Sequence, residues 1–144
     1  MKCVIALLLI AGSAFAGAPK ARTLKFTRNP AQAVDSQNAR DKFGRLVQCY
    51  SDNQNKYQRF LECSRKSFLP SIDEDTLKEL TTFLTLSKEV FDLRACTPDE
   101  IAFGKKTGAT GTQYCFDLVT HDDEKRLGLG FFNANSIITD IRVF

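Results

Sequence analysis

The stretch Tyr114–Phe144, YCFDLVTHDDEKRLGLGFFNANSIITDIRVF, decides how this chain is expected to fold. Apolar residues recur through it with a period of two, the pattern of β-strands that bury one face. Two polar clusters, Asp122–Glu124 and Asn133–Asn135, interrupt the alternation and predict turns. The stretch therefore predicts an antiparallel meander of three strands, with alternating sets Tyr114, Phe116, Leu118, then Leu127, Leu129, Phe131, then Ile137, Thr139, Ile141, Val143.

Upstream of the meander the apolar residues recur every three or four positions, which is typical of amphipathic helices. One continuous helix is expected from Asp35 to the proline at position 70, although polar Asn53 and Gln54 interrupt its apolar stripe. That stripe comprises Phe43, Val47, Tyr50, Tyr57, Phe60, Leu61, Ser64 and Phe68.

Two further helices are indicated by their start signals. Ser71 with Glu74 forms a capping box before a second helix, whose expected buried face runs from Leu77 to Phe91. Thr97, followed by Pro98, Asp99 and Glu100, predicts a third, short helix that ends at Gly104. Helices followed by strands predict an α+β fold: two or three N-terminal helices packed on a C-terminal antiparallel sheet of three or more strands, with two disulfides.

The N-terminus has the pattern of a cleavable export signal. Lys2 precedes the apolar run Val4–Ala11, and Ala14-Phe15-Ala16 supplies the small residues at a cleavage site. We expect residues 1–16 to be a signal peptide, 17–34 an extended basic arm, and 35–144 a single α+β domain. The predicted localisation is therefore secreted and extracellular, and the expected mature chain has no transmembrane segment.

The cysteines fit an exported protein. Cys3 leaves with the signal, and Cys49, Cys63, Cys96 and Cys115 form an even set, which predicts two disulfides. On one continuous helix Cys49 and Cys63 would be about 21 Å apart, too far to bond. Each would then pair with Cys96 or Cys115. If Ser51–Asn55 instead breaks the helix into a hairpin, a Cys49–Cys63 bond becomes possible.

Several kinds of chemistry find little support in the sequence. The single histidine, His121, excludes mechanisms and zinc sites that need several imidazoles. Gly104–Gly111 resembles a phosphate loop but follows a predicted helix and enters a strand, the reverse of that motif. Asp117 and Glu62 are candidate carboxylates for a hydrolase, without an identifiable partner. We assign no catalytic set, no metal site and no cofactor.

The phenylalanines are the most suggestive feature that remains. Gly128 and Gly130 fall on one face of the middle strand and leave bare backbone there, with Phe131-Phe132 beyond them and Phe116 on the preceding strand. A concave sheet of this composition is a candidate site for an apolar ligand. The competing and more common arrangement is a phenylalanine-rich core in which the glycines admit a closely packed helix.

These observations predict a secreted, disulfide-stabilised binding protein for a small apolar ligand or an extracellular protein partner. The candidate ligand residues are Phe116, Gly128, Gly130, Phe131 and Phe132. One alternative is a small extracellular hydrolase that uses acidic side chains. Another is a host-directed or interaction effector that acts through its basic N-terminal arm. The formal net charge of +3 gives no argument for nucleic acid as a partner.

Overall fold

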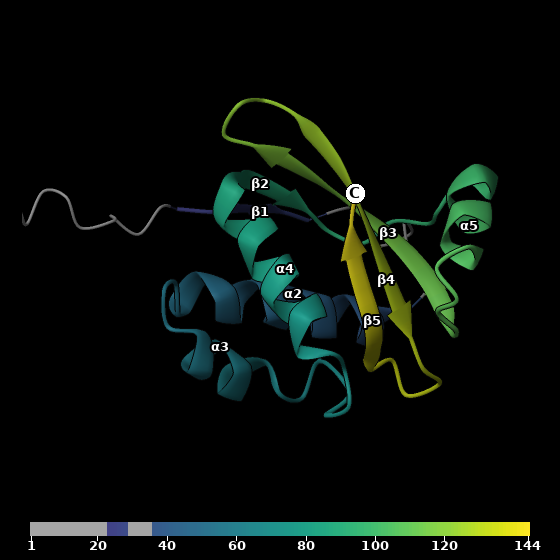
Figure 1. Cartoon of the computed structure of the whole chain (residues 1–144), viewed down its shortest axis with the longest axis horizontal. Coiled ribbons are helices and arrows are strands. Elements are labelled where there is room, and N and C mark those ends of the chain that lie inside the picture. The colour runs from purple at the N-terminus through teal and green to yellow at the C-terminus, as the bar shows by residue number, and fades with distance from the viewer. Residues whose placement is uncertain (1–22, 29–35) are drawn as a thin grey trace, which may run out of the picture.

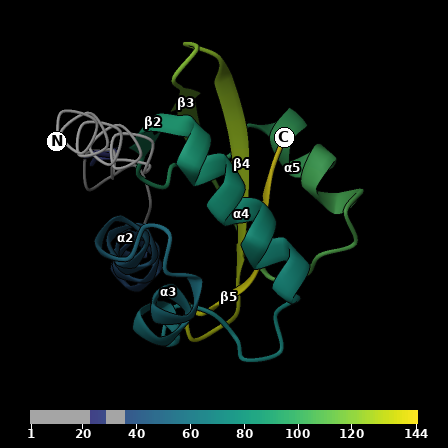
Figure 2. The same ribbon diagram turned by 60° about the vertical axis from the view of Figure 1, so that its left-hand side comes forward.

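Among the described residues, three helices lie on one side of a five-stranded sheet, the second of them packed on the first, and a fourth lies on the other side (Figures 1 and 2). The computed structural model describes residues 23–28 and 36–144. The predicted signal peptide and most of the predicted arm lie outside the described residues. The helices are α2 (Gln37–Asp52), α3 (Tyr57–Ser64), α4 (Glu74–Leu86) and α5 (Pro98–Lys105).

The sheet has the strand order β1-β2-β3-β4-β5. The predicted meander is confirmed as three antiparallel strands, and two more strands extend it on the β3 side. The first of these, β2, is antiparallel to β3, whereas β1 is parallel to β2, so the sheet is mixed. The α+β class is therefore confirmed. The strands are β1 (Lys25–Thr27), β2 (Ser87–Phe91), β3 (Thr112–Thr120), β4 (Lys125–Phe132) and β5 (Ile138–Val143).

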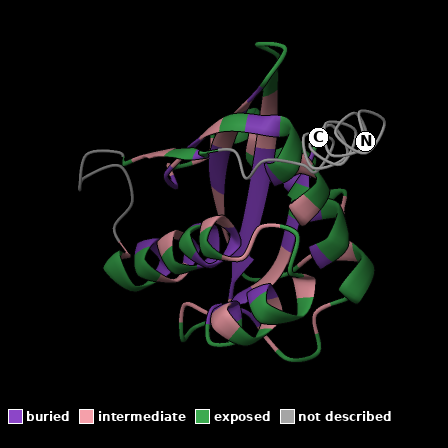
Figure 3. Cartoon of the chain, turned by 90° about the vertical axis from the view of Figure 1, so that its left-hand side faces the viewer, coloured by how far each residue is buried: buried purple, intermediate pink, exposed green. Residues whose placement is uncertain are grey.

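Alternation along the strands divides the apolar residues between two cores. One face of β3 contributes Phe116 and Leu118 to the main core beneath α2, α3 and α4. The other face contributes Cys115, which joins Leu129 and Phe131 in a smaller cluster on the α5 side. Figure 3 shows the buried residues concentrated along the sheet and on the inward faces of the helices. The period of two read from the sequence thus corresponds to a sheet that is covered on both faces.

The prediction of one continuous helix from Asp35 to the proline is wrong. The chain leaves helix α2 after Asp52, and Asn55 adopts a left-handed conformation with φ of 64° before α3 begins at Tyr57. Asparagine tolerates this conformation better than most residues. The reversal brings Cys49 and Cys63 to a Cα–Cα distance of 5.6 Å, and they form a disulfide. The pairing of these two cysteines with Cys96 and Cys115 is therefore also wrong, because Cys96 bonds to Cys115.

The second predicted helix ends sooner than its apolar pattern indicates. Its N-cap is Asp73, whose side chain accepts a hydrogen bond from the Asp75 N–H, rather than Ser71. It ends at Leu86, and the next five residues are strand β2, in which Val90 is fully buried opposite Leu118. Pairing with β3 thus overrides the local helical period. The third predicted helix is confirmed with its complete capping box.

A buried charge cluster joins the start of the described chain to the sheet. Asp92, at the end of β2, is fully buried and accepts hydrogen bonds from the guanidinium of Arg40 on α2. Arg28, just after β1, is also within 3.3 Å of this carboxylate. A buried carboxylate has to be paired, so these contacts fix β1 and α2 against the edge of the sheet.

Candidate functional site

The five residues predicted as a ligand site occupy the interior of the sheet. The ring of Phe116 lies directly over Gly128, where an added Cβ would be only 2.2 Å from ring carbons. Phe43 from α2 packs against Phe116 in a tilted arrangement, with ring centroids 4.7 Å apart. Gly130 and Phe132 lie on this same face, whereas Phe131 points to the α5 side. Ligand binding at these residues stays a prediction, and it would require the Phe116 ring to move.

An open groove of about 560 Å³ lies elsewhere, between α3, the segment that follows it and the start of α4. We call it the α3–α4 groove. Its volume is within the range of small-molecule sites. Apolar side chains among its walls include Leu61, Phe68 and Leu77. Its complete lining is Tyr57, Gln58, Leu61, Arg65, Phe68, Pro70, Ile72, Glu74 and Leu77.

A second, smaller cavity of about 230 Å³ adjoins the groove at Tyr57, which lines both. We call it the α2–α3 pocket, because the turn between these helices forms one of its walls. Its lining contains more polar residue types and no carboxylate: Tyr50, Asn53, Asn55, Lys56, Tyr57, Phe60, Thr81 and Thr85. We call the two cavities, which share Tyr57, the track; most of the residues without a polar side chain belong to the groove.

Tyr57 lines both the groove and the pocket. Its hydroxyl oxygen is buried and has no hydrogen-bond partner among the described residues. Burial, with smaller contributions from the charges of Glu74 and Asp75, raises the pKa of the Tyr57 phenol above its ordinary value. The hydroxyl therefore keeps its proton at neutral pH, and because its oxygen is buried, donation to a ligand would require the Tyr57 ring to move. An unpaired buried hydroxyl costs free energy, and a ligand acceptor would recover it.

Local structure explains why the groove stays open. The Cys49–Cys63 disulfide ties α3 to α2, and Phe60 packs against Tyr50 with ring centroids 6.3 Å apart. The chain beyond α3 is held by the last strand, because the Leu69 N–H donates to the Ile138 carbonyl and the Ile138 N–H donates to the Ser67 carbonyl. These two attachments fix the groove walls on opposite sides.

The charged side chains that line the track differ in whether they form an ion pair. Lys56 and Arg65 are exposed and make no ion pair with any residue in the described part of the chain. Glu74, the carboxylate that lines the groove, lies 3.6 Å from Lys78. The track therefore presents two unpaired cations and a partly neutralised acid.

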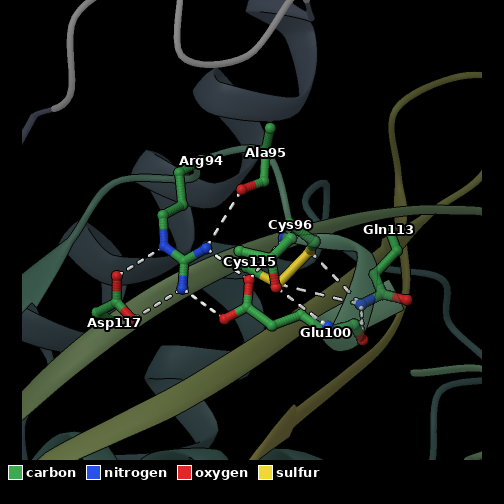
Figure 4. Close-up of a disulfide and its surroundings, with 8 residues drawn as sticks. Arg94, Ala95, Cys96, Glu100, Gln113, Cys115 and Asp117 are labelled. Atoms are coloured by element: carbon green, nitrogen blue, oxygen red, sulfur yellow. Dashed lines mark hydrogen bonds and ion pairs between the residues drawn. A yellow bond between two sulfur atoms is a disulfide. The ribbon is translucent and has the colours of Figure 1, made fainter. Parts of the chain in front are cut away.

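A different cluster surrounds the second disulfide on the far face of the sheet (Figure 4). Arg94 donates to both oxygens of Glu100, at 2.7 and 2.8 Å, and to both oxygens of Asp117, at 2.8 and 3.1 Å. These hydrogen bonds from Arg94 lower the pKa of Glu100 to about 2, and they raise the pKa of Arg94 further above its ordinary value. Asp117, a candidate hydrolase carboxylate, is therefore engaged with a cation.

Within residues 23–28 and 36–144, one group could bring three metal-ligand atoms together: Cys96, Glu100 and Cys115, within 4.8 Å of one another. The two sulfurs are bonded to each other and the Glu100 carboxylate is bound by Arg94. In this arrangement the donors are already occupied, because zinc requires thiolates rather than a disulfide. The cluster fastens α5 to the sheet.

The remaining acid and base candidates are separate from one another. His121 is exposed just after β3, where its backbone N–H donates to the Leu86 carbonyl. Glu62 is exposed on α3. Asp73 and Asp140 line one polar cleft, but Asp73 caps α4 and Asp140 accepts from the side chain of Arg142 and the N–H of Ile141. Each of these two carboxylates already has a structural partner.

A comparison with protein families, curated proteins and solved structures finds no match to this chain. None of the described helices is long and apolar enough to cross a bilayer. The groove was not among the sites predicted from the sequence, since Tyr57 and Leu61 were assigned to the buried stripe of one long helix. The signal that could have revealed it is the polar run Ser51–Asn55, because a break there places Tyr57 at a helix start.

Proposed function

We propose that this protein is a secreted binding protein that holds a small apolar ligand in the α3–α4 groove. The observation that carries the proposal is the groove itself, with the apolar side chains of Leu61, Phe68, Ile72 and Leu77 along it. Pockets of this size that are lined mainly by apolar groups are the usual sites of small ligands.

Three further observations support this function. Both disulfides are compatible with an oxidising, extracellular compartment. One of them fastens α3, which supplies one wall of the groove. Of the two candidate hydrolase carboxylates, Asp117 is held by Arg94 and Glu62 is exposed on α3. The carboxylates of the polar cleft, Asp73 and Asp140, also have structural partners, so a binding role explains more of the structure than a hydrolase does.

The test is titration of the full secreted chain with N-phenyl-1-naphthylamine, a neutral apolar probe whose emission rises in apolar surroundings. The protein has no tryptophan, which keeps its own fluorescence low. We expect one probe per chain, and a loss of affinity of at least tenfold in Leu61→Glu, because the substitution places a charge in the groove. Leu86→Glu is the matched control, since Leu86 is 53 % exposed and is not part of the groove lining.

Two results would overturn the proposal. One is a native chain that neither binds the probe nor carries a ligand detectable by native mass spectrometry. The other is equal probe affinity in Leu61→Glu and the wild type, which would place the probe elsewhere.

A further inference from the structure

We infer that the ligand is an anionic amphiphile: a single aliphatic chain lies in the α3–α4 groove, and a small anionic head group lies in the α2–α3 pocket beside Tyr57 and Lys56. This inference rests on the proposed function and names the chemistry of its ligand. The head group is a carboxylate or a phosphate monoester, which share one anionic centre and several hydrogen-bond acceptors.

The first step of the argument is the division of the track. The groove lining includes five residues without a polar side-chain group, whereas the pocket lining offers amide, hydroxyl and ammonium groups. Tyr57 is common to both linings, and the inferred ligand spans the two cavities past it. A purely apolar ligand would leave the polar groups of the α2–α3 pocket without a hydrogen-bond partner from the ligand.

The second step is the state of the polar groups. The hydroxyls of Tyr50 and Thr85 hydrogen-bond to each other at 2.7 Å, and the Asn53 amide donates to the Cys49 carbonyl. By contrast, the Tyr57 hydroxyl is buried without a partner among the described residues and can only gain by donating. The group that recovers this hydrogen bond is an acceptor, which an anionic head supplies.

The third step is charge complementarity. Lys56 lines the pocket, Arg65 lines the groove, and neither has an ion pair within the described part of the chain. No side chain caps the start of α3, so its positive helix end adds to the potential of Lys56. Glu74 and Asp75 oppose an anion beside Tyr57, since their charges raise the pKa of its phenol, but Lys78 lies 3.6 Å from Glu74. The balance favours a negative head group at the Lys56 end.

The experiment is calorimetric titration of the full secreted chain with dodecanoate, dodecyl phosphate and dodecan-1-ol, each below its micellar concentration. The wild type should bind dodecanoate or dodecyl phosphate about tenfold more tightly than the alcohol, the effect of one charge-assisted hydrogen bond. A preference for one anion over the other then identifies the head group.

The variants locate the head group. Lys56→Gln and Tyr57→Phe should each weaken binding of the preferred anion three- to tenfold and leave the affinity for dodecan-1-ol unchanged. Lys66→Gln is the matched control, because Lys66 is an exposed lysine outside both linings. Since Lys56 is exposed, its variant remains informative even if Tyr57→Phe alters stability.

The outcomes separate the two claims. If the alcohol and both anions bind equally and Lys56→Gln changes nothing, the anionic head group is overturned while the apolar site remains. If no compound binds and N-phenyl-1-naphthylamine does not bind either, the proposed function itself fails.

Discussion

Helices α3 and α5 are both eight residues long and both are fastened by one disulfide, yet they are specified in different ways. Helix α5 carries its own signals: a capping box between Thr97 and Glu100, a proline in its first turn and one buried residue, Gly104. Helix α3 has no side-chain cap and depends on the burial of Phe60 and Ser64.

The difference shows that a short helix can be placed by its sequence or by its surroundings. Eight residues are too few for a stable helix alone. Helix α5 compensates with local hydrogen bonds and the Arg94 ion pairs, whereas α3 compensates with an aromatic anchor in the main core. The helix that lines the proposed ligand site is the one that its local sequence specifies least.

The largest expected effect is the loss of the α3 anchor. Phe60 is 1 % exposed and contacts the rings of Tyr50 and Tyr57. Phe60→Ala should lower the free energy of unfolding by about 3–5 kcal/mol. On α5, Ile101→Ala at a residue that is 40 % exposed should change it by less than about 0.5 kcal/mol. Urea unfolding measures both, and similar losses would show that α3 is not held by its anchor.

Removal of either disulfide should come next. The bonds close loops of 14 and 19 residues, for which the chain-entropy model gives about 3 kcal/mol each. The two disulfide variants should differ more in the hydrogen exchange of their helices than in their free energy of unfolding. Amides of α3 should lose protection in Cys49→Ala/Cys63→Ala, whereas α5 should keep part of its protection in Cys96→Ala/Cys115→Ala. If α3 and α5 lost protection equally, the proposed difference in how the two helices are stabilised would be wrong. A peptide map of the non-reduced protein checks the disulfide connectivity itself.

The ion pairs of α5 predict a dependence on pH. The pKa of Glu100 is lowered to about 2 in the folded chain from 4.5, so its contribution is present above pH 4.5 and is lost as the pH falls towards 2. We expect a loss of about 2 kcal/mol over this range, after allowance for partial exposure. In Glu100→Gln this part of the acid destabilisation should be absent. Unfolding free energies measured from pH 5 to pH 2 would contradict the prediction if the two slopes were the same.

The smallest expected effect compares two predicted caps. Thr97 accepts a hydrogen bond from the Glu100 N–H, so Thr97→Ala should cost about 1 kcal/mol. Ser71, the predicted cap of the second helix, is exposed and lies two residues before the observed cap, Asp73. Ser71→Ala should therefore change the melting temperature by less than Thr97→Ala does. The reverse order would restore Ser71 as the cap.

The parts of the fold that were predicted from the sequence are those with local determinants. The period of two over β3 and β4 and the box at Thr97 depend on neighbouring residues, and the structure confirms both. In β5 the predicted set fails at its start, because a register shift against β4 buries Ile138 in place of Ile137 and Thr139. The break at Asn55 was offered only as an alternative, because its left-handed backbone interrupts a stripe that is otherwise helical. Strand β2 was missed because its pairing with β3, about 30 positions away, decides its conformation.

The candidate site was missed for the same reason. Its walls come from α3, the segment around Phe68 and the start of α4, and the segment is positioned by a contact with Ile138. No pattern within a short window links these residues. The phenylalanines drew attention to the sheet, where Phe116 fills the space above Gly128.

The bridge between Phe68 and Ile138 also has a consequence for the order of events during synthesis. Phe68 lines the groove, but the strand that holds its segment lies about 70 residues later in the sequence. A nascent chain therefore cannot complete the groove until the residues around Ile138 have left the ribosome. Contacts this distant in sequence also form slowly. A chain truncated before residue 138 should therefore lack the contact that positions Phe68, and with it one wall of the groove.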